Sequence, residues 1–219
     1  MSQELHYTSV PRGLLPGTRG FCTVACPLNM SGPLRERLES LSGYQQVFPP
    51  HDPKVGLNPV VFSHHRLNLG GRSYSVLSRV CFAGLDYTSR SNKYAHHVVL
   101  DPAERPSGGP AWLLSQPGFM EESWQGDPRF ITTGRTPPQG DHPTGIAHSW
   151  QSLTGDAGWA GTLAESFITD QQRPVVLIFE PGMNLLPLLV EALALLPEPR
   201  RWDVEFSTYF TQRGRAATK

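Results

Sequence analysis

Two pairs of adjacent histidines are the residues of this sequence best suited to chemistry. His96 and His97 enter an apolar run, and His64 and His65 stand near the end of an earlier run of β-forming residues. Imidazole groups bind metal ions and transfer protons near neutral pH. Neighbouring residues of a strand point to opposite faces, so neither pair chelates one ion from a regular strand. One histidine from the first pair can still meet one histidine from the second pair across neighbouring strands.

A catalytic zinc ion needs three protein ligands, and the sequence shows no spacing that supplies them. The remaining histidines stand on distant segments; they are His6, His51, His142 and His148. Neither H-E-x-x-H nor C-x-x-C occurs. We therefore predict no metal and no cofactor. We favour a structural role, in which one ring of the His96/His97 pair packs inward and the other faces a groove or a partner. The inward ring is expected to be that of His96.

The three cysteines offer little chemistry. Cys22 and Cys26 lie on one predicted strand, about 13 Å apart at the rise of a strand, which is too far for a disulfide. Cys81 stands within an apolar run and is expected to be a small core residue. The alternative is a nucleophilic pair of Cys22 with His96 or His97, which rests on the residue types alone.

Motifs for nucleotide hydrolysis and acyl transfer are missing from the sequence. It contains neither the phosphate-binding loop G-x-x-x-x-G-K-[ST] nor the nucleophile motif G-x-S-x-G, so the chain is not expected to be an NTPase itself. No catalytic residue is assigned. The candidate functional surface consists of His96, His97, His64, His65 and Asn92. The alternative function is that of a hydrolase or of a ligand-binding domain, and either would use the His96/His97 region of this surface.

Most of these residues belong to segments with the pattern of β-strands. The predicted strands are 4–9, 20–26, 58–67, 72–86 and 93–101. The sequence NLGG at 68–71 predicts a hairpin turn between two of them. An amphipathic helix is predicted over 31–44, because Leu34, Leu38 and Leu41 recur at helical spacing after Ser31, a suitable N-cap. This helix is expected to cover the sheet.

The last third of the chain predicts two more strands around a helix. The continuous apolar run 173–180 is typical of a strand covered on both faces, and residues 200–211 alternate as a strand does. Residues 184–196 are apolar almost all round, which predicts a buried helix. We therefore predict an α/β or α+β fold, with a mixed β-sheet, a covering helix near the N-terminus and a buried helix between two C-terminal strands.

The middle of the chain is rich in Gly, Pro, Ser and Thr. Structureless loops as long as 102–172 are rare in compact domains, so short helices are expected near 111–116 and 158–169. The predicted organisation is a single globular domain, 1–211, with a long Gly/Pro-rich insertion around 102–172. Residues 212–219 are predicted to be a linker or tail.

The composition excludes several classes of partner. Lys plus Arg and Asp plus Glu number 19 each, so no overall charge attracts nucleic acid or a membrane surface. The N-terminus has neither the basic region nor the apolar region of a secretory signal. Three cysteines are too few for a disulfide framework and favour a reducing compartment. The protein is therefore predicted to be cytoplasmic.

Four segments together resemble a bacterial protein family. They are ELHYTSVPRGLLPGTRGFCTVAC (4–26), LRERLESLSGY (34–44), SHHRLNLGGRSYSVLSRVCFAGLDYTSRSNKYAHHVVLD (63–101) and WDVEFSTYFT (202–211). In these segments the chain is similar to the second type of N-terminal domain of the GTPase-associated proteins. The resemblance implies a non-catalytic adaptor or interaction domain of a bacterial conflict (defence) system. Its implied partners are a GTPase, other components of that system and further domains of the same full-length protein.

Overall fold

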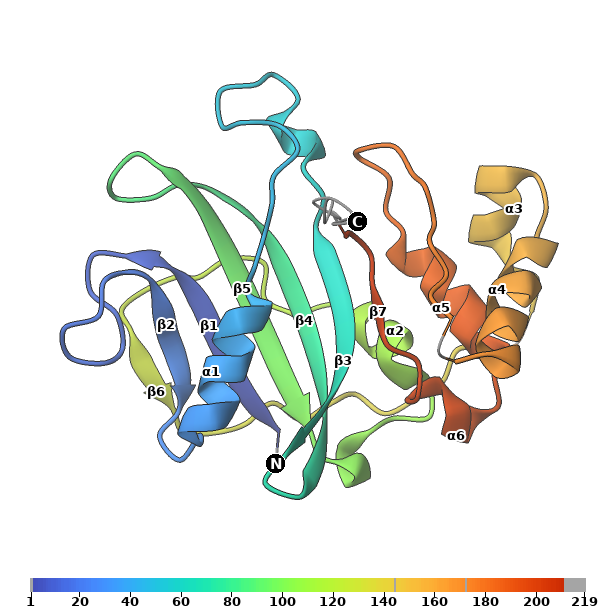
Figure 1. The fold of residues 1–219 in the computed structure, drawn as a ribbon, viewed down its shortest axis with the longest axis horizontal. Helices are drawn as coiled ribbons and strands as arrows, with labels where there is room; N and C mark the ends of the chain where they lie inside the picture. Colours follow the sequence, from blue (N-terminus) through green and yellow to red (C-terminus); the bar gives the residue numbers. More distant parts are fainter. Residues whose placement is uncertain (1, 144, 172, 211–219) are drawn as a thin grey trace, which may run out of the picture.

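A seven-stranded sheet forms the centre of the protein. The computed structural model describes residues 2–143, 145–171 and 173–210, and the predicted tail lies outside them. The strand order is β6-β2-β1-β5-β4-β3-β7 (Figure 1). The pairs are antiparallel except that β6 runs parallel to β2, so the sheet is mixed. This confirms the predicted α/β or α+β class.

The five strands predicted in the first hundred residues all form. The strands of the sheet are β1 Gln3–Val10, β2 Gly20–Pro27, β3 Val61–Leu69, β4 Arg72–Leu85, β5 Ser91–Leu100, β6 Arg129–Ile131 and β7 Phe206–Ser207. The predicted hairpin turn joins β3 to β4. Gly70 and Gly71 both have positive φ there, 58° and 74°, which a residue with a side chain rarely adopts.

Helix α1 covers one face of the sheet, as predicted. The helices are α1 Gly32–Leu41, α2 Gly109–Leu114, α3 His148–Thr154, α4 Gly158–Thr169, α5 Leu186–Ala194 and α6 Glu198–Arg201. Leu34 and Leu38 of α1 are buried against Leu5 of β1 and Val99 of β5. Ser31 precedes α1 with extended backbone, although its side chain makes no capping hydrogen bond.

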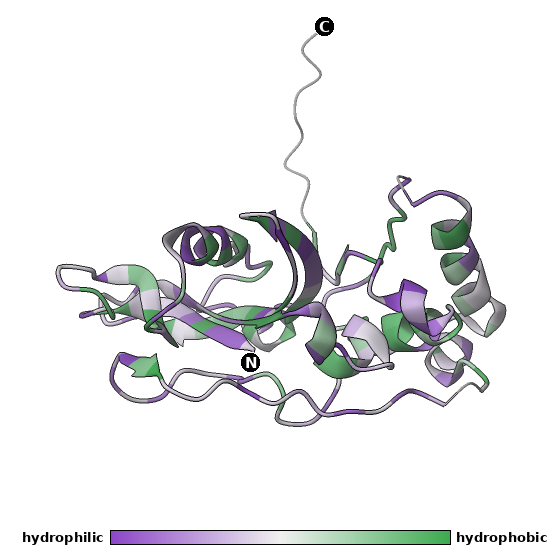
Figure 2. Ribbon diagram, turned by 90° about the horizontal axis from the view of Figure 1, so that it is seen from below, coloured by the Kyte–Doolittle hydropathy of each residue, from purple (hydrophilic) through white to green (hydrophobic). Residues whose placement is uncertain are grey.

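The opposite face of the sheet packs on α2 and α5. Leu77 of β4 and Val98 of β5 share a core cluster with Leu113 of α2 and Leu193 of α5. Figure 2 shows α1 on one face and the long segment between α2 and α3 running across the other. Helices α3 and α4 then pack on the far side of α5 through a smaller apolar cluster. The burial predicted for α5 is confirmed.

The two predicted C-terminal strands are corrected by the structure. Residues 173–180 form no strand, because the sheet ends at β7 and no neighbouring strand lies beside them in the described chain. Of residues 200–211, only Phe206 and Ser207 pair with β3. The start of this segment instead belongs to α6, which ends at the buried Arg201. The Arg201 guanidinium stabilises this turn because it donates to the carbonyl groups of Ala194 and Leu196. Helix α5 therefore does not lie between two full strands.

The segment 102–172 contains more regular structure than its composition predicts. Helices α2 and α4 form near the expected positions, and α3 and β6 are additional. Helix α3 is held by α5, because the Glu191 carboxylate accepts the N–H groups of Ser149 and Trp150 and the Trp150 indole donates to the Leu188 carbonyl. Among the residues described, none of the helices combines the length and apolar character needed to cross a bilayer.

Candidate functional site

The adjacent histidines of β5 lie on opposite faces of the sheet, as predicted. His97 points toward α1, where Nε2 lies 2.9 Å from the Ser42 hydroxyl and Nδ1 lies 2.7 Å from the Ser78 hydroxyl. His96 points to the other face, where its Nδ1 accepts the N–H of Glu121 at 2.9 Å. Both rings are fully buried. The expectation that one of them faces a groove or partner is therefore wrong, because both faces of the sheet are covered at this point.

The other members of the predicted surface are dispersed. His64 is fully buried and binds the Val204 carbonyl at 2.6 Å and the Ser75 hydroxyl at 3.0 Å. His65 and Asn92 are partly buried. The Asn92 side chain accepts the N–H of Ser9 at 3.1 Å and so links the ends of β1 and β5. Since β4 separates β3 from β5, the two histidine pairs do not meet and the five residues form no common exposed surface.

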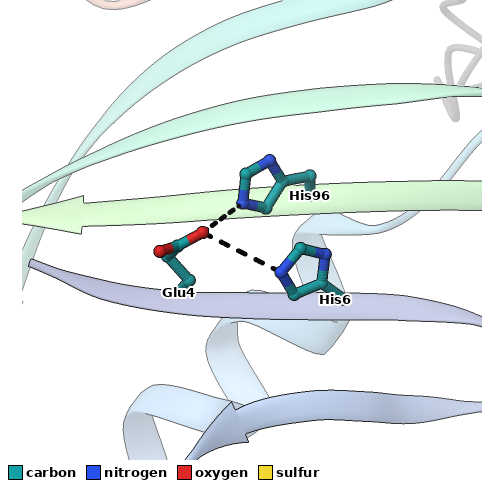
Figure 3. Close-up of side chains that lie close together, drawn as sticks. All are labelled: Glu4, His6 and His96. Carbon is teal, nitrogen blue, oxygen red and sulfur yellow. Dashed lines mark hydrogen bonds and ion pairs between the residues drawn. The ribbon is translucent and has the colours of Figure 1, made fainter. Parts of the chain in front are cut away.

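A different cluster joins Glu4, His6 and His96 (Figure 3). The register of β1 and β5 sets His6 directly opposite His96 and Glu4 opposite Val98, so all three side chains share one face. The Glu4 carboxylate oxygen Oε2 lies 3.0 Å from His96 Nε2 and 3.9 Å from His6 Nε2. The cluster was missed from the sequence. Its only signal was the spacing Glu-x-His in a predicted strand, which puts two polar side chains on one face.

Arg135 connects this cluster to the segment that follows α2. Its Nε lies 3.1 Å from Glu4 Oε2, and its Nη2 lies 2.7 Å from the carboxylate of Glu121. Glu121 also donates its main-chain N–H to His96. His6 Nδ1 in turn lies 2.8 Å from the Tyr94 hydroxyl. These contacts attach the long segment across the sheet, so the cluster stabilises the covering of this face.

Burial and charge determine the protonation of the three groups. Burial lowers the pKa of His6 to about 3 and also lowers the pKa of His96. Burial would raise the pKa of Glu4, but the hydrogen bond from His96 and the charge of Arg135 outweigh it and lower that pKa to about 2. Near neutral pH, Glu4 is therefore ionised and both histidines are neutral.

The residue types of this cluster suit a divalent cation, and their ligand atoms all lie within 4.8 Å of one another. Three geometric features oppose such a site. The rings of His6 and His96 stack 4.3 Å apart at 10°, so their in-plane lone pairs run parallel and do not converge. His96 Nδ1 accepts an N–H, which leaves the proton of the neutral ring on the Nε2 that faces Glu4. The guanidinium of Arg135 already compensates the Glu4 charge.

The three cysteines are free and buried. Burial raises the pKa of Cys22, Cys26 and Cys81, which disfavours the reactive thiolate. Cys81 lies 3.2 Å from a guanidinium nitrogen of Arg79. Among the described residues no recorded hydrogen bond joins a cysteine to a histidine, so the alternative of a Cys–His pair gains no support.

The clearest accessible feature is an apolar groove beside α3 and α4, which we call the α3–α4 groove. It has a volume of about 560 Å³, and its lining includes Trp150, Leu153, Trp159, Ile178, Phe179 and Met183. Glu180 is the one charged residue of this lining. Residues 177–180 belong to this lining, and we call the segment 175–179, in which Val176 is 79% and Ile178 98% exposed, the edge of the groove. Leu177 and Phe179 instead pack against the cluster beneath the groove.

The structure therefore defines an α+β protein in which the strand histidines His6, His64, His96 and His97 are buried and the C-terminal helices carry an apolar groove. The family model of the GTPase-associated protein 1 N-terminal domain, type 2, matches residues 1–139, and the model of the GTPase-associated protein 1 middle domain matches residues 147–218. The chain belongs to the GTPase-associated protein 1 family. Comparison with curated proteins and with solved structures found no match.

Proposed function

We propose that this chain is a non-catalytic adaptor that couples a GTPase to other components of a bacterial conflict (defence) system. The family name associates such proteins with a GTPase. The observation that carries the proposal is the exposed apolar edge of the α3–α4 groove, where Ile178 is 98% exposed. Exposed apolar patches with a polar rim commonly mark sites of protein–protein contact. The groove belongs to the part of the chain that matches the middle domain.

The proposed location is the cytoplasm, and the proposed partners are proteins. Free cysteines suit a reducing compartment. Equal numbers of acidic and basic residues give no field that would attract nucleic acid or anionic lipid. Besides the GTPase, we propose as partners the other components of the same system and further domains of the same full-length protein.

The enzymatic alternative is a hydrolase or ligand-binding domain that uses the His96/His97 region. In its favour, the carboxylate of Glu4 orients the ring of His96 in the way that an acidic residue orients a catalytic base. Against it, both ring nitrogens of His96 and of His97 are already hydrogen-bonded, and both side chains are fully buried. A substrate would have to displace the segment around Glu121 to reach either ring. We therefore favour the adaptor.

A pull-down with a GTPase of the proposed system tests the proposal. The immobilised full chain is incubated with that GTPase in its GTP-bound, GDP-bound and nucleotide-free forms. We expect retention in at least one nucleotide state, because an adaptor must contact its GTPase at some point of the cycle. An absence of retention in all three states contradicts the adaptor function.

A further inference from the structure

The edge of the α3–α4 groove has the side-chain pattern of a β-strand without a strand partner. From Val176 to Glu180, exposed and partly buried residues alternate. Leu177 packs on the cluster beneath the groove, and Phe179 makes an edge contact with Tyr209 at 6.3 Å between ring centroids. Within the described chain, no main-chain hydrogen bond is recorded for residues 174–179. Their N–H and C=O groups are therefore not used in main-chain hydrogen bonds to any other described residue.

The composition of this segment is that of an interior strand. Residues 175–179 read VVLIF, which combines β-branched, aliphatic and aromatic side chains and contains no charge. Exposed strand edges are normally protected from pairing by charged residues or proline. Here the protecting types occur only at the ends, as Arg173, Pro174 and Glu180. The uncovered centre indicates a segment that is built to be paired.

The two ends of the segment are bordered by acidic side chains. A hollow of about 470 Å³ at the first end is lined by Glu165 and Asp170 together with Arg173. Glu180 borders the groove at the other end. Because Glu165 and Glu180 outnumber Arg173 at this edge, a partner strand with basic residues at its ends is complementary in charge.

We propose that an extended segment of a partner protein adds as a β-strand to Val175–Phe179. The partner segment carries apolar side chains at alternate positions, which cover Val176 and Ile178, and Lys or Arg at its ends. Main-chain hydrogen bonds supply affinity in this mode of recognition, and the groove selects the side chains. The inference rests on the proposed adaptor function, because it assumes that this surface meets a protein. Beyond that function, the inference specifies the partner segment as an extended strand with alternating apolar side chains and basic ends.

Amide hydrogen exchange on the full chain tests the proposal. The probe is a synthetic peptide of about nine residues, with Val and Thr alternating between two lysines at each end. We expect the alternate amides of Val175–Phe179 that face the added strand to exchange about tenfold more slowly when the peptide is present in excess. A peptide with glutamates in place of the lysines is expected to protect them less. Absence of protection at these amides, or equal protection by both peptides, overturns the proposal.

Two variants separate main-chain pairing from apolar contact. Val176→Pro removes one donor and keeps an apolar side chain, and Ile178→Asp keeps the donor and adds a charge. Neither change should lower the melting temperature, because both side chains are exposed and residues 174–179 make no recorded main-chain hydrogen bond. Each variant should lose the protection. Strand addition is overturned if the peptide protects the remaining amides of Val176→Pro as fully as those of the wild type. It is also overturned if these amides already exchange slowly in the free wild-type protein.

The pull-down and the exchange experiment can fail independently. If the lysine peptide protects the segment but no GTPase is retained, strand addition stands with another partner and the adaptor function for a GTPase fails. If the GTPase is retained but the lysine peptide protects none of the amides of this segment, the adaptor function stands and strand addition fails.

Discussion

His97 stands between two hydroxyl groups from different elements, so its ring links the end of α1 to β4. Ser42 follows α1, and Ser78 lies in β4. A hydrogen-bonded ring in this position stabilises the packing of the helix on the sheet only while both of its nitrogens keep their partners. The prediction of one inward ring and one outward ring implies that His96 and His97 respond differently to substitution. Their equal burial changes that expectation.

We predict that His97→Ala and His96→Ala both lower the free energy of unfolding. Each change leaves buried polar groups without partners, which costs about 1–3 kcal/mol before any cavity is counted. Urea denaturation of the two variants measures the loss. His51→Ala is the control, since His51 is exposed and should change the free energy of unfolding little. A stable His97→Ala protein would contradict the structural role of this ring.

The pH dependence of stability provides a second test of the buried rings. Burial lowers the pKa of His97 to about 3, so the folded protein keeps the ring neutral where the unfolded chain binds a proton. The unfolded state therefore binds more protons between about pH 6.5 and 3, and stability falls as the pH falls through this window.

His97→Asn should weaken that dependence, because its amide can still meet Ser78 at the position of Nδ1 but does not titrate. Between about pH 6 and 4, the slope of the unfolding free energy should decrease by about 1.4 kcal/mol per pH unit relative to the wild type. Urea denaturation across this range gives both slopes. Equal slopes would mean that His97 is accessible to protons in the folded protein.

The opposite faces of His96 and His97 could be predicted from the sequence, and their surroundings could not. The alternation of a strand fixes which side chains share a face. Whether that face is covered depends on residues distant in the chain, such as Glu121 and Arg135, which come from a segment without strong periodicity. The cluster of Glu4, His6 and His96 was missed for the same reason, because it requires the register of two strands that are about ninety residues apart.

At the scale of elements, α5 connects the sheet to the other C-terminal helices. Leu193 belongs to the cluster shared with β4 and β5, and Ala192 belongs to the cluster shared with α3 and α4. The apolar pattern of 184–196 predicted this burial. Strands with local turn signals were predicted equally well, for example the hairpin at Gly70 and Gly71.

We predict that Leu193→Ala or Leu189→Ala lowers the free energy of unfolding by about 2–5 kcal/mol, because each leaves a cavity between α5 and its neighbours. Leu195→Ala is the matched control, since Leu195 follows the same helix and is exposed. Thermal or urea denaturation of the three variants measures the difference. A loss in Leu195→Ala as large as in Leu193→Ala would show that α5 is not buried in the way described.

The segment 173–180 shows where prediction of elements fails. Its composition is that of a covered strand, but a strand forms only where a second strand supplies hydrogen-bond partners. Composition cannot say which chain supplies them. At residues 200–211 the local pattern of Trp202, Val204 and Phe206 also suggested a strand, and the buried guanidinium of Arg201 imposed a helical turn there.

At the scale of the whole molecule, two surfaces differ in character. The sheet is covered by α1 on one face and by helices and the long segment after α2 on the other (Figure 2). The C-terminal helices leave the α3–α4 groove and its edge exposed. The two family matches follow the same division, with the sheet mainly in the first and α3–α6 in the second. We therefore expect partners to bind at the C-terminal helices.

The most direct test is a calorimetric titration of a GTPase of the proposed system with three forms of the chain: wild type, Ile178→Asp and Leu28→Asp. Leu28 is the matched control, because it is 77% exposed and belongs to the turn between β2 and α1. Figure 1 shows α1 and the helices α3 and α4 at opposite ends of the molecule. We predict that Ile178→Asp raises the dissociation constant at least about tenfold, since a buried apolar contact is worth about 1.5–3 kcal/mol, and that Leu28→Asp leaves it unchanged. Equal affinity of the wild type and Ile178→Asp would contradict an adaptor that binds through this edge.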